Sequence, residues 1–190
     1  MYLHFRNMDK TKIIYEIQAS LEVNRPTISL DIAENKKVNW KEANAIRFEN
    51  APAESYKKPI KLTVKEKNPQ DWDCYYCSGL LFFSQKAFTL LGDAAWDNYE
   101  RFQVEINGFP YFFLRCKKKS DALDRKRSKM KHFGEGDDQY FDIERYTFHH
   151  DRIDPDKLFS ISETNAILCN DKLIDLIMKH LTGILLVELI

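Results

Sequence analysis

Two cysteines flank a tyrosine pair in Cys74-Tyr75-Tyr76-Cys77, the C-x-x-C spacing of a zinc half-site or of a redox-active thiol pair. A zinc site needs a second pair of ligands, but the sequence has no second C-x-x-C motif, and Cys116 and Cys169 each stand alone. A redox pair normally opens a helix, whose N-terminus lowers the thiol pKa. The tyrosines, with Trp72 before them, indicate an extended aromatic segment instead. We therefore expect reduced, metal-free thiols.

A second candidate is His149-His150-Asp151, which could supply metal ligands or a general base. Adjacent histidines on a strand point to opposite faces, so the two cannot easily share one metal ion. Solvated or edge-strand histidines are the interpretation that we favour. No G-x-G-x-x-G, G-x-S-x-G or H-E-x-x-H motif occurs. The sequence thus predicts no enzyme, cofactor or metal, and leaves open a metal-dependent hydrolase that would use Cys74, Cys77 and one of these histidines.

Charge is concentrated in residues 117–139, which contain almost no apolar residues. The segment is basic as far as Lys131 and turns acidic after Gly134. Blocks of opposite sign predict a long, exposed loop that builds no core. The segment has no glycine-rich phosphate loop and no aromatic platform for bases. Its candidate contact residues for a partner are Arg125, Lys126, Arg127, Lys129, Lys131, Glu135, Asp137 and Asp138.

Composition restricts the class of partner. The chain has 190 residues, of which 44% are apolar, as in folded proteins. Basic and acidic residues both number 29, so the net charge is zero and bulk attraction to nucleic acid or anionic lipid is not expected. The N-terminal residues lack the pattern of a secretory signal, and the apolar runs are too short to cross a membrane. We expect a cytoplasmic protein with reduced cysteines.

The elements around these residues follow from the apolar pattern. Short apolar or alternating stretches predict strands at Lys12–Ile17, within Pro26–Ile32 and at Ile60–Lys65. After Gly79, the continuous run Leu80–Phe83 predicts a buried strand, and Ser84 is a suitable N-cap for a helix that ends at Gly92. Further strands are predicted at Phe102–Ile106 and Pro110–Leu114. The dipeptide Asn107-Gly108 between them predicts a type I′ hairpin turn.

The same order recurs near the C-terminus. A strand at Ala166–Cys169, an N-cap at Asn170, a helix to Leu181, a stop at Gly183 and a strand at Ile184–Val187 are predicted. Helical spacing puts Leu173, Ile174, Ile177, Met178 and Leu181 on the face toward the core. The recurrence is either a duplicated unit or a chance repetition of common strand–helix–strand patterning. Both helices are expected on a mostly buried sheet, in one α+β domain with a mixed sheet.

Two stretches also resemble a known family. The first runs from Lys58-Pro59-Ile60 through Asp73, Gly79–Ala87 and the predicted hairpin to Asp121-Ala122-Leu123-Asp124. The second runs from Ile153 through Leu158–Ile161 and Asn170–Leu173 to Leu181-Thr182-Gly183-Ile184. In order and spacing, residues 59–190 resemble the immunity-eleven family of bacterial polymorphic-toxin systems, while residues 1–58 form a variable, β-rich part.

The resemblance implies a function. Proteins of this kind are encoded beside a secreted or contact-delivered toxin, bind its C-terminal domain and protect the cell from it. The family pattern carries no catalytic residues. The expected function is therefore a non-catalytic immunity protein for interbacterial competition. The alternative from a different class is a nucleic-acid or adaptor module that uses the basic residues of the charged segment.

Overall fold

The structure is a computed structural model that describes residues 13–20, 28–30, 60–64, 72–77, 80–133 and 140–190. The strands in this part of the chain are β1 (Ile14–Ala19), β2 (Ile28–Leu30), β3 (Ile60–Val64), β4 (Cys74–Cys77), β5 (Leu80–Ser84), β6 (Tyr99–Ile106), β7 (Phe109–Cys116), β8 (Lys129–Phe133), β9 (Tyr140–Arg145), β10 (Ile167–Asn170) and β11 (Ile184–Leu189). The α-helices are α2 (Gln85–Leu91) and α3 (Asp171–His180), and short 3-10 turns cover Asp93–Trp96 and His150–Arg152.

A six-stranded sheet has the order β2-β3-β6-β7-β5-β4. It is mixed, as predicted, because β3 and β6 are parallel while the other neighbours are antiparallel. Strands β6 and β7 form the predicted hairpin. Asn107 and Gly108 have φ angles of 49° and 89°, the positive values that a type I′ turn requires.

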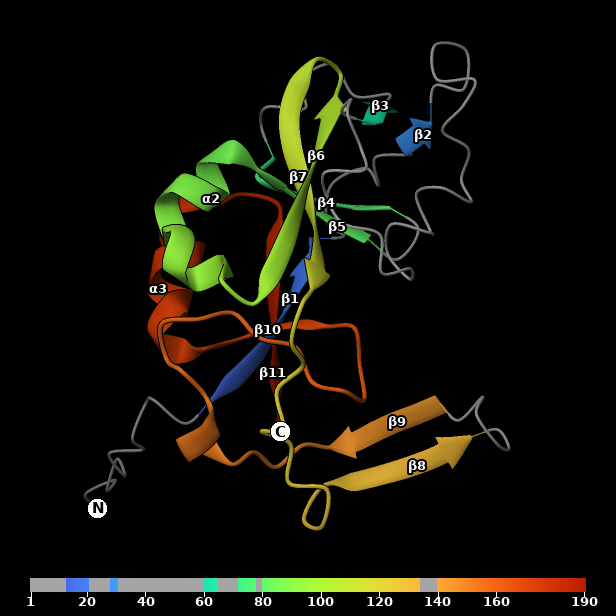
Figure 1. Ribbon diagram of the computed structural model, residues 1–190, viewed down its shortest axis with the longest axis vertical. Helices are drawn as coiled ribbons and strands as arrows, with labels where there is room; N and C mark the ends of the chain where they lie inside the picture. The colour runs from blue at the N-terminus through green and yellow to red at the C-terminus, as the bar shows by residue number, and fades with distance from the viewer. Residues whose placement is uncertain (1–12, 21–27, 31–59, 65–71, 78–79, 134–139) are drawn as a thin grey trace, which may run out of the picture.

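A three-stranded sheet has the order β10-β1-β11, and β1 runs antiparallel to both neighbours. Strands β10 and β11 are therefore parallel to each other and separated by β1. Strands β5 and β6 stand in the same relation across β7. Each strand–helix–strand unit thus places two parallel strands around one antiparallel strand, which confirms the predicted crossovers (Figure 1).

The helix boundaries follow from local capping. The Ser84 hydroxyl accepts a hydrogen bond from the Ala87 N–H at 3.2 Å, and Asn170 accepts one from the Lys172 N–H at 3.1 Å. Gly92 ends α2 with φ of 76°. Helices α2 and α3 lie on the same side of the molecule (Figure 1), and their apolar faces share a core with β1, β5 and β10. Neither described helix is long and apolar enough to cross a membrane.

The predicted face of α3 needs one correction. Leu173, Ile177 and Leu181 are buried, as predicted, but Met178 is 59% exposed. At about 100° per residue, Met178 lies well outside the arc that the three buried residues define. The neighbouring strand β11 is also less covered than expected, because it is an edge strand and its Leu185 is 42% exposed.

The prediction of a long solvated loop at residues 117–139 was wrong for residues 117–133, and residues 134–139 lie outside the described part of the chain. Ala122, Leu123 and Asp124 are buried, and the first two pack against Ile14 of β1 and Leu168 of β10 in a second core cluster. The segment then forms β8, which pairs with β9 in a two-stranded hairpin. The two apolar residues Ala122 and Leu123 are enough to anchor this charged segment, and its average composition did not reveal them.

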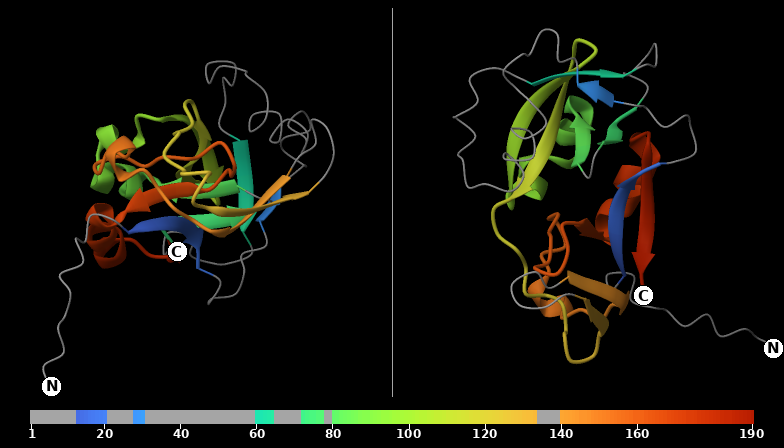
Figure 2. Two further views of the ribbon diagram at one scale, coloured as in Figure 1. Left: turned by 90° about the horizontal axis from the view of Figure 1, so that it is seen from below. Right: turned by 90° about the vertical axis from the view of Figure 1, so that its right-hand side faces the viewer.

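One junction joins the two larger sheets, which the right-hand view of Figure 2 shows as separate layers. The Asp73 carboxylate, just before β4, accepts hydrogen bonds from Ser84, from Lys86 and from both the N–H and the hydroxyl of Thr182 before β11. Beside it, a Cβ on Gly183 would lie 2.6 Å from the Trp72 ring and 2.9 Å from the Cys74 carbonyl oxygen. Only glycine permits this close approach.

Candidate functional site

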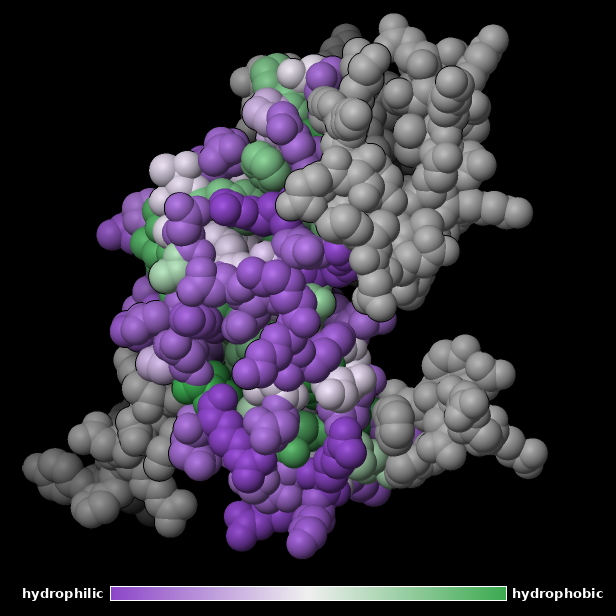
Figure 3. All heavy atoms as spheres, viewed as in Figure 1, coloured by the Kyte–Doolittle hydropathy of each residue, from purple (hydrophilic) through white to green (hydrophobic). Residues whose placement is uncertain are grey.

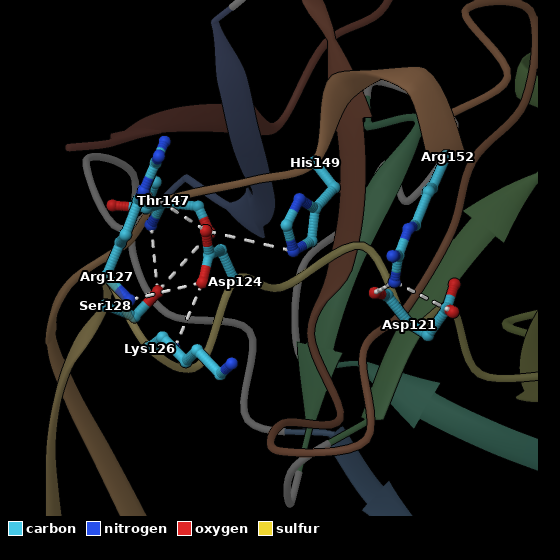
Figure 4. A network of polar contacts seen from close by, with 8 residues as sticks. All are labelled: Asp121, Asp124, Lys126, Arg127, Ser128, Thr147, His149 and Arg152. Carbon is cyan, nitrogen blue, oxygen red and sulfur yellow. Dashed lines mark hydrogen bonds and ion pairs between the residues drawn. The ribbon is translucent and has the colours of Figure 1, made fainter.

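The buried Asp124 organises an exposed basic turn, residues 124–128 (Figure 4). Its Oδ1 atom accepts hydrogen bonds from the N–H groups of Lys126 and Arg127 at 3.0 and 3.2 Å. Its carbonyl oxygen accepts one from Ser128 N–H at 2.8 Å, and its own N–H donates to the carbonyl oxygen of Thr147 at 2.8 Å. These are the contacts of an Asx turn, in which a short side chain fixes the following backbone. The three cations after Asp124 are therefore displayed from a fixed base.

Along this region the cations are exposed, and the carboxylate partners of the two arginines on the turn are covered. Arg127 pairs with Asp124, with side chains 79% and 12% exposed. Arg125 pairs with Glu163, with side chains 66% and 3% exposed. On the hairpin, Lys129 and Lys131 both pair with Glu144 of β9, and their hydrogen bonds lower the pKa of Glu144 to about 2. We call the five exposed cations Arg125, Lys126, Arg127, Lys129 and Lys131 the basic ridge.

A hollow of about 620 Å³ opens beside the turn. Its far wall is Arg152, whose Nη1 donates to both the carboxylate and the carbonyl oxygen of Asp121. His149 lies between this pair and the turn (Figure 4), with its Nε2 atom 3.8 Å from Asp124 Oδ2. Figure 3 shows hydrophilic residues over most of the described surface of this face, including the lower part, where Figure 1 draws the turn and the hairpin.

The structure brings five of the eight predicted contact residues to one region, the basic ridge. Glu135, Asp137 and Asp138 lie outside the described residues. Sequence reasoning missed the partners Glu144 and Glu163 and the wall residue Arg152, because they are remote in the chain and sit in no motif. The Asp-Arg-Lys-Arg order at residues 124–127 was the one local signal, since aspartate before exposed polar residues is typical of an Asx turn.

The cysteine pair lies on β4, which confirms the predicted extended segment and gives the thiols no helix N-terminus. Burial raises the pKa of Cys74, with a smaller contribution from Asp73, and burial raises the pKa of Cys169 to about 12. These two thiols are therefore protonated at neutral pH and poorly nucleophilic. Among the described residues, no three His, Cys, Asp or Glu side chains are grouped as metal ligands would be. The metal-free state stays a prediction.

Of the two alternatives for His149 and His150, the edge strand was wrong, while their partly exposed side chains agree with solvated histidines. His149 precedes a 3-10 turn that contains His150, and its N–H donates to the Ala122 carbonyl oxygen at 2.7 Å. Both side chains are partly exposed. His149 thereby helps to hold the Ala122 anchor of the charged segment against the body of the protein.

A second hollow, of about 660 Å³, lies where the two larger sheets approach each other and is lined mainly by apolar side chains. Its polar groups already bond within the protein. The Tyr99 hydroxyl pairs with Ser160, which donates to the Ala166 carbonyl oxygen, while Lys119 donates to Thr164 and Asn165. The first hollow, which adjoins the basic ridge, is therefore the better candidate for recognition of a charged partner.

No family model matches the chain, and no curated protein matches it. The resemblance to the immunity-eleven family stays a prediction. Several residues that carry it have structural roles, because Asp73, Ser84 and Thr182 meet at the sheet junction and Asn170 caps α3.

Proposed function

We propose that this protein is a cytoplasmic immunity protein that binds a cognate toxin domain and neutralises it without catalysis. The observation that carries the proposal is the basic turn, whose backbone is fixed by the buried carboxylate of Asp124 while its cations are exposed. The resemblance of residues 59–190 to immunity proteins supplies the class of partner.

A fixed charged surface suits this task for two physical reasons. A turn whose backbone is already ordered loses little backbone entropy on binding, so more of the contact energy appears as affinity. A local field on a molecule of zero net charge accelerates encounters with a complementary partner and disfavours others. Rapid and selective capture is what a cell needs when it meets a delivered toxin.

The alternative is nucleic-acid binding, which the same five exposed cations favour. Phosphates would contact the basic ridge, and the affinity would fall steeply with salt. Within the described residues, however, each arginine of the ridge and both hairpin lysines pair with a carboxylate. Binding of a nucleic-acid backbone needs a continuous row of uncompensated cations, so these ion pairs weaken it more than they weaken the binding of a protein surface.

Charge reversal tests the proposal. The variant Arg125→Glu, Lys126→Glu, Arg127→Glu is compared with Lys117→Glu, Lys118→Glu, Lys179→Glu, which makes the same change in net charge at exposed positions elsewhere. Association with the toxin domain encoded beside the gene is measured by stopped-flow fluorescence, and protection is measured by co-expression. We expect the ridge variant to associate at least about tenfold more slowly and to lose salt dependence, because steering raises association rates by 10- to 1,000-fold.

A neutral version, Arg125→Gln, Lys126→Gln, Arg127→Gln, accompanies it, since Glu at position 125 would face the buried Glu163. If both ridge variants bind the toxin as the wild type does, the ridge is not the interface. If wild-type protein binds a single-stranded RNA oligomer and leaves the toxin unbound, the immunity proposal is wrong.

A further inference from the structure

We infer that the hollow between the basic turn and Arg152 receives a carboxylate side chain from an acidic protrusion of the partner. The inference rests on the proposed function and names the chemistry of the toxin surface. Four cations line the hollow: Arg125, Lys126 and Arg127 on the turn, and Arg152 on the far wall.

The sign of the opening follows from which charges reach solvent. Two carboxylates that line the hollow, Asp124 and Glu163, have side chains only 12% and 3% exposed, so a partner does not meet them directly. The third, Asp121, is exposed but already pairs with Arg152 at 3.1 Å. On the turn, the guanidinium groups of Arg125 and Arg127 stand outside the carboxylates with which they pair, whereas on the far wall Asp121 and Arg152 are both exposed and compensate each other. A group that approaches the turn therefore meets positive charge first.

Donor capacity remains at each cation. Lys126 forms no ion pair with any residue in the described part of the chain, so its ammonium can donate to a ligand. Arg152 uses Nη1 for Asp121, and Arg125 uses Nε for Glu163. A guanidinium has five N–H donors, so each arginine keeps others for a second carboxylate. Carboxylates match this fork geometry and bind it in a bidentate way.

The hollow is also held in shape from several directions. Ser120 forms a β-bridge with Ile161, the Ala122 carbonyl oxygen accepts from His149 N–H, and Arg152 N–H donates to the His149 carbonyl oxygen. Such a volume accommodates an acidic side chain together with the backbone that carries it. No phenylalanine, tyrosine or tryptophan lines the hollow and His149 is its single ring, so the row of aromatic side chains on which single-stranded nucleic acids stack is missing there. Charge and shape together favour an acidic protein loop.

The first experiment titrates ¹⁵N-labelled protein with hexaglutamate, with hexauridylate and with inorganic phosphate, and follows amide chemical shifts. We expect hexaglutamate to shift the amides of Lys126, Arg127 and Arg152. The double variant Lys126→Gln, Arg152→Gln should lose these shifts, while the control Lys118→Gln, Lys179→Gln keeps them. The inference is overturned if the double variant responds as the wild type does, if hexauridylate binds more tightly, or if phosphate alone reproduces the shifts at equal concentration.

The second experiment measures the affinity of the double variant for the toxin domain. An affinity at least tenfold lower than that of the wild type supports the inference, provided that replacing one acidic toxin residue by alanine does not lower the affinity of the double variant further. If the toxin binds the wild type and the double variant equally, the hollow is not where the toxin carboxylate binds, and the immunity proposal stands. If the toxin binds neither protein, the proposed function fails, while the peptide titration still decides whether the hollow binds carboxylates.

Discussion

Asp73 shows how much can depend on one buried side chain. Burial alone would raise the pKa of its carboxyl group, but hydrogen bonds from Ser84, Lys86 and the Thr182 N–H outweigh that effect, and the pKa is lowered. The ionised form is therefore the one that the folded state stabilises. Its contribution is fully present above the ordinary pKa of 3.8 and is lost as the pH falls through the lower folded value.

We predict that Asp73→Asn lowers the free energy of unfolding at pH 7 by about 1–3 kcal/mol, because the neutral amide cannot replace every charged hydrogen bond. The difference from wild type should shrink below pH 3.8. Urea unfolding at pH 7 and at pH 3 measures both effects. The exposed Asp175→Asn is the control and should behave as wild type at both values. A loss of equal size at both pH values would contradict the role of the ionised form.

At this scale, local contacts were predictable from sequence and remote ones were not. Ser84 and Asn170 cap helices that begin within one or two residues of them, so their roles follow from neighbouring sequence. Asp73 meets Thr182 across 109 residues, and no local pattern records such a partner. For the same reason the burial of Asp124 was not predictable, because its N–H donates to Thr147, which lies 23 residues further along the chain.

Among the elements, helix α3 has a buried and an exposed apolar residue at adjacent positions. Ile177 is fully buried, whereas Met178 beside it is 59% exposed. We predict that Ile177→Asp costs several kcal/mol, which is comparable with a typical total stability of about 5–15 kcal/mol, because it buries an unpaired carboxylate. Met178→Asp should change stability by less than about 1 kcal/mol. Thermal unfolding of the two variants compares them, and similar losses would mean that the face of α3 is assigned wrongly.

Strands with clean alternation or strong turn signals were predictable, and a strand inside a charged run was not. The hairpin of β6 and β7 follows from its apolar alternation and its Asn107-Gly108 turn. Strand β8 has two lysines and a histidine among its five residues, a composition that does not predict a strand. Its pairing with β9 is what holds it extended. Its lysines form ion pairs with Glu144 on β9, so the sequence of either strand alone does not predict the hairpin.

For the whole molecule, the contact at Gly183 decides how the two larger sheets join. Gly183→Ala would place a side chain at φ of 74° and against the Cys74 carbonyl oxygen, which is backbone and cannot move aside. We predict a loss of about 1–2 kcal/mol from the left-handed conformation, with about 1–3 kcal/mol more from overpacking. Gly108→Ala, at φ of 89° with nothing within 4 Å, should show the first loss alone. Equal losses in urea unfolding would mean that the junction tolerates a larger separation.

The position of β1 has a consequence for how the chain folds during synthesis. Ile14 pairs with Asn170 on one side and with Leu189 on the other, so this early strand finds both partners near the end of the chain. At the translation rates of cells, β1 is made roughly ten to thirty seconds before β11. Until β10 is made, shortly before β11, both edges of β1 lack their final neighbours, and an unpaired edge is a template for aggregation. Ribosome-bound chains should therefore depend on chaperones until β11 has been made.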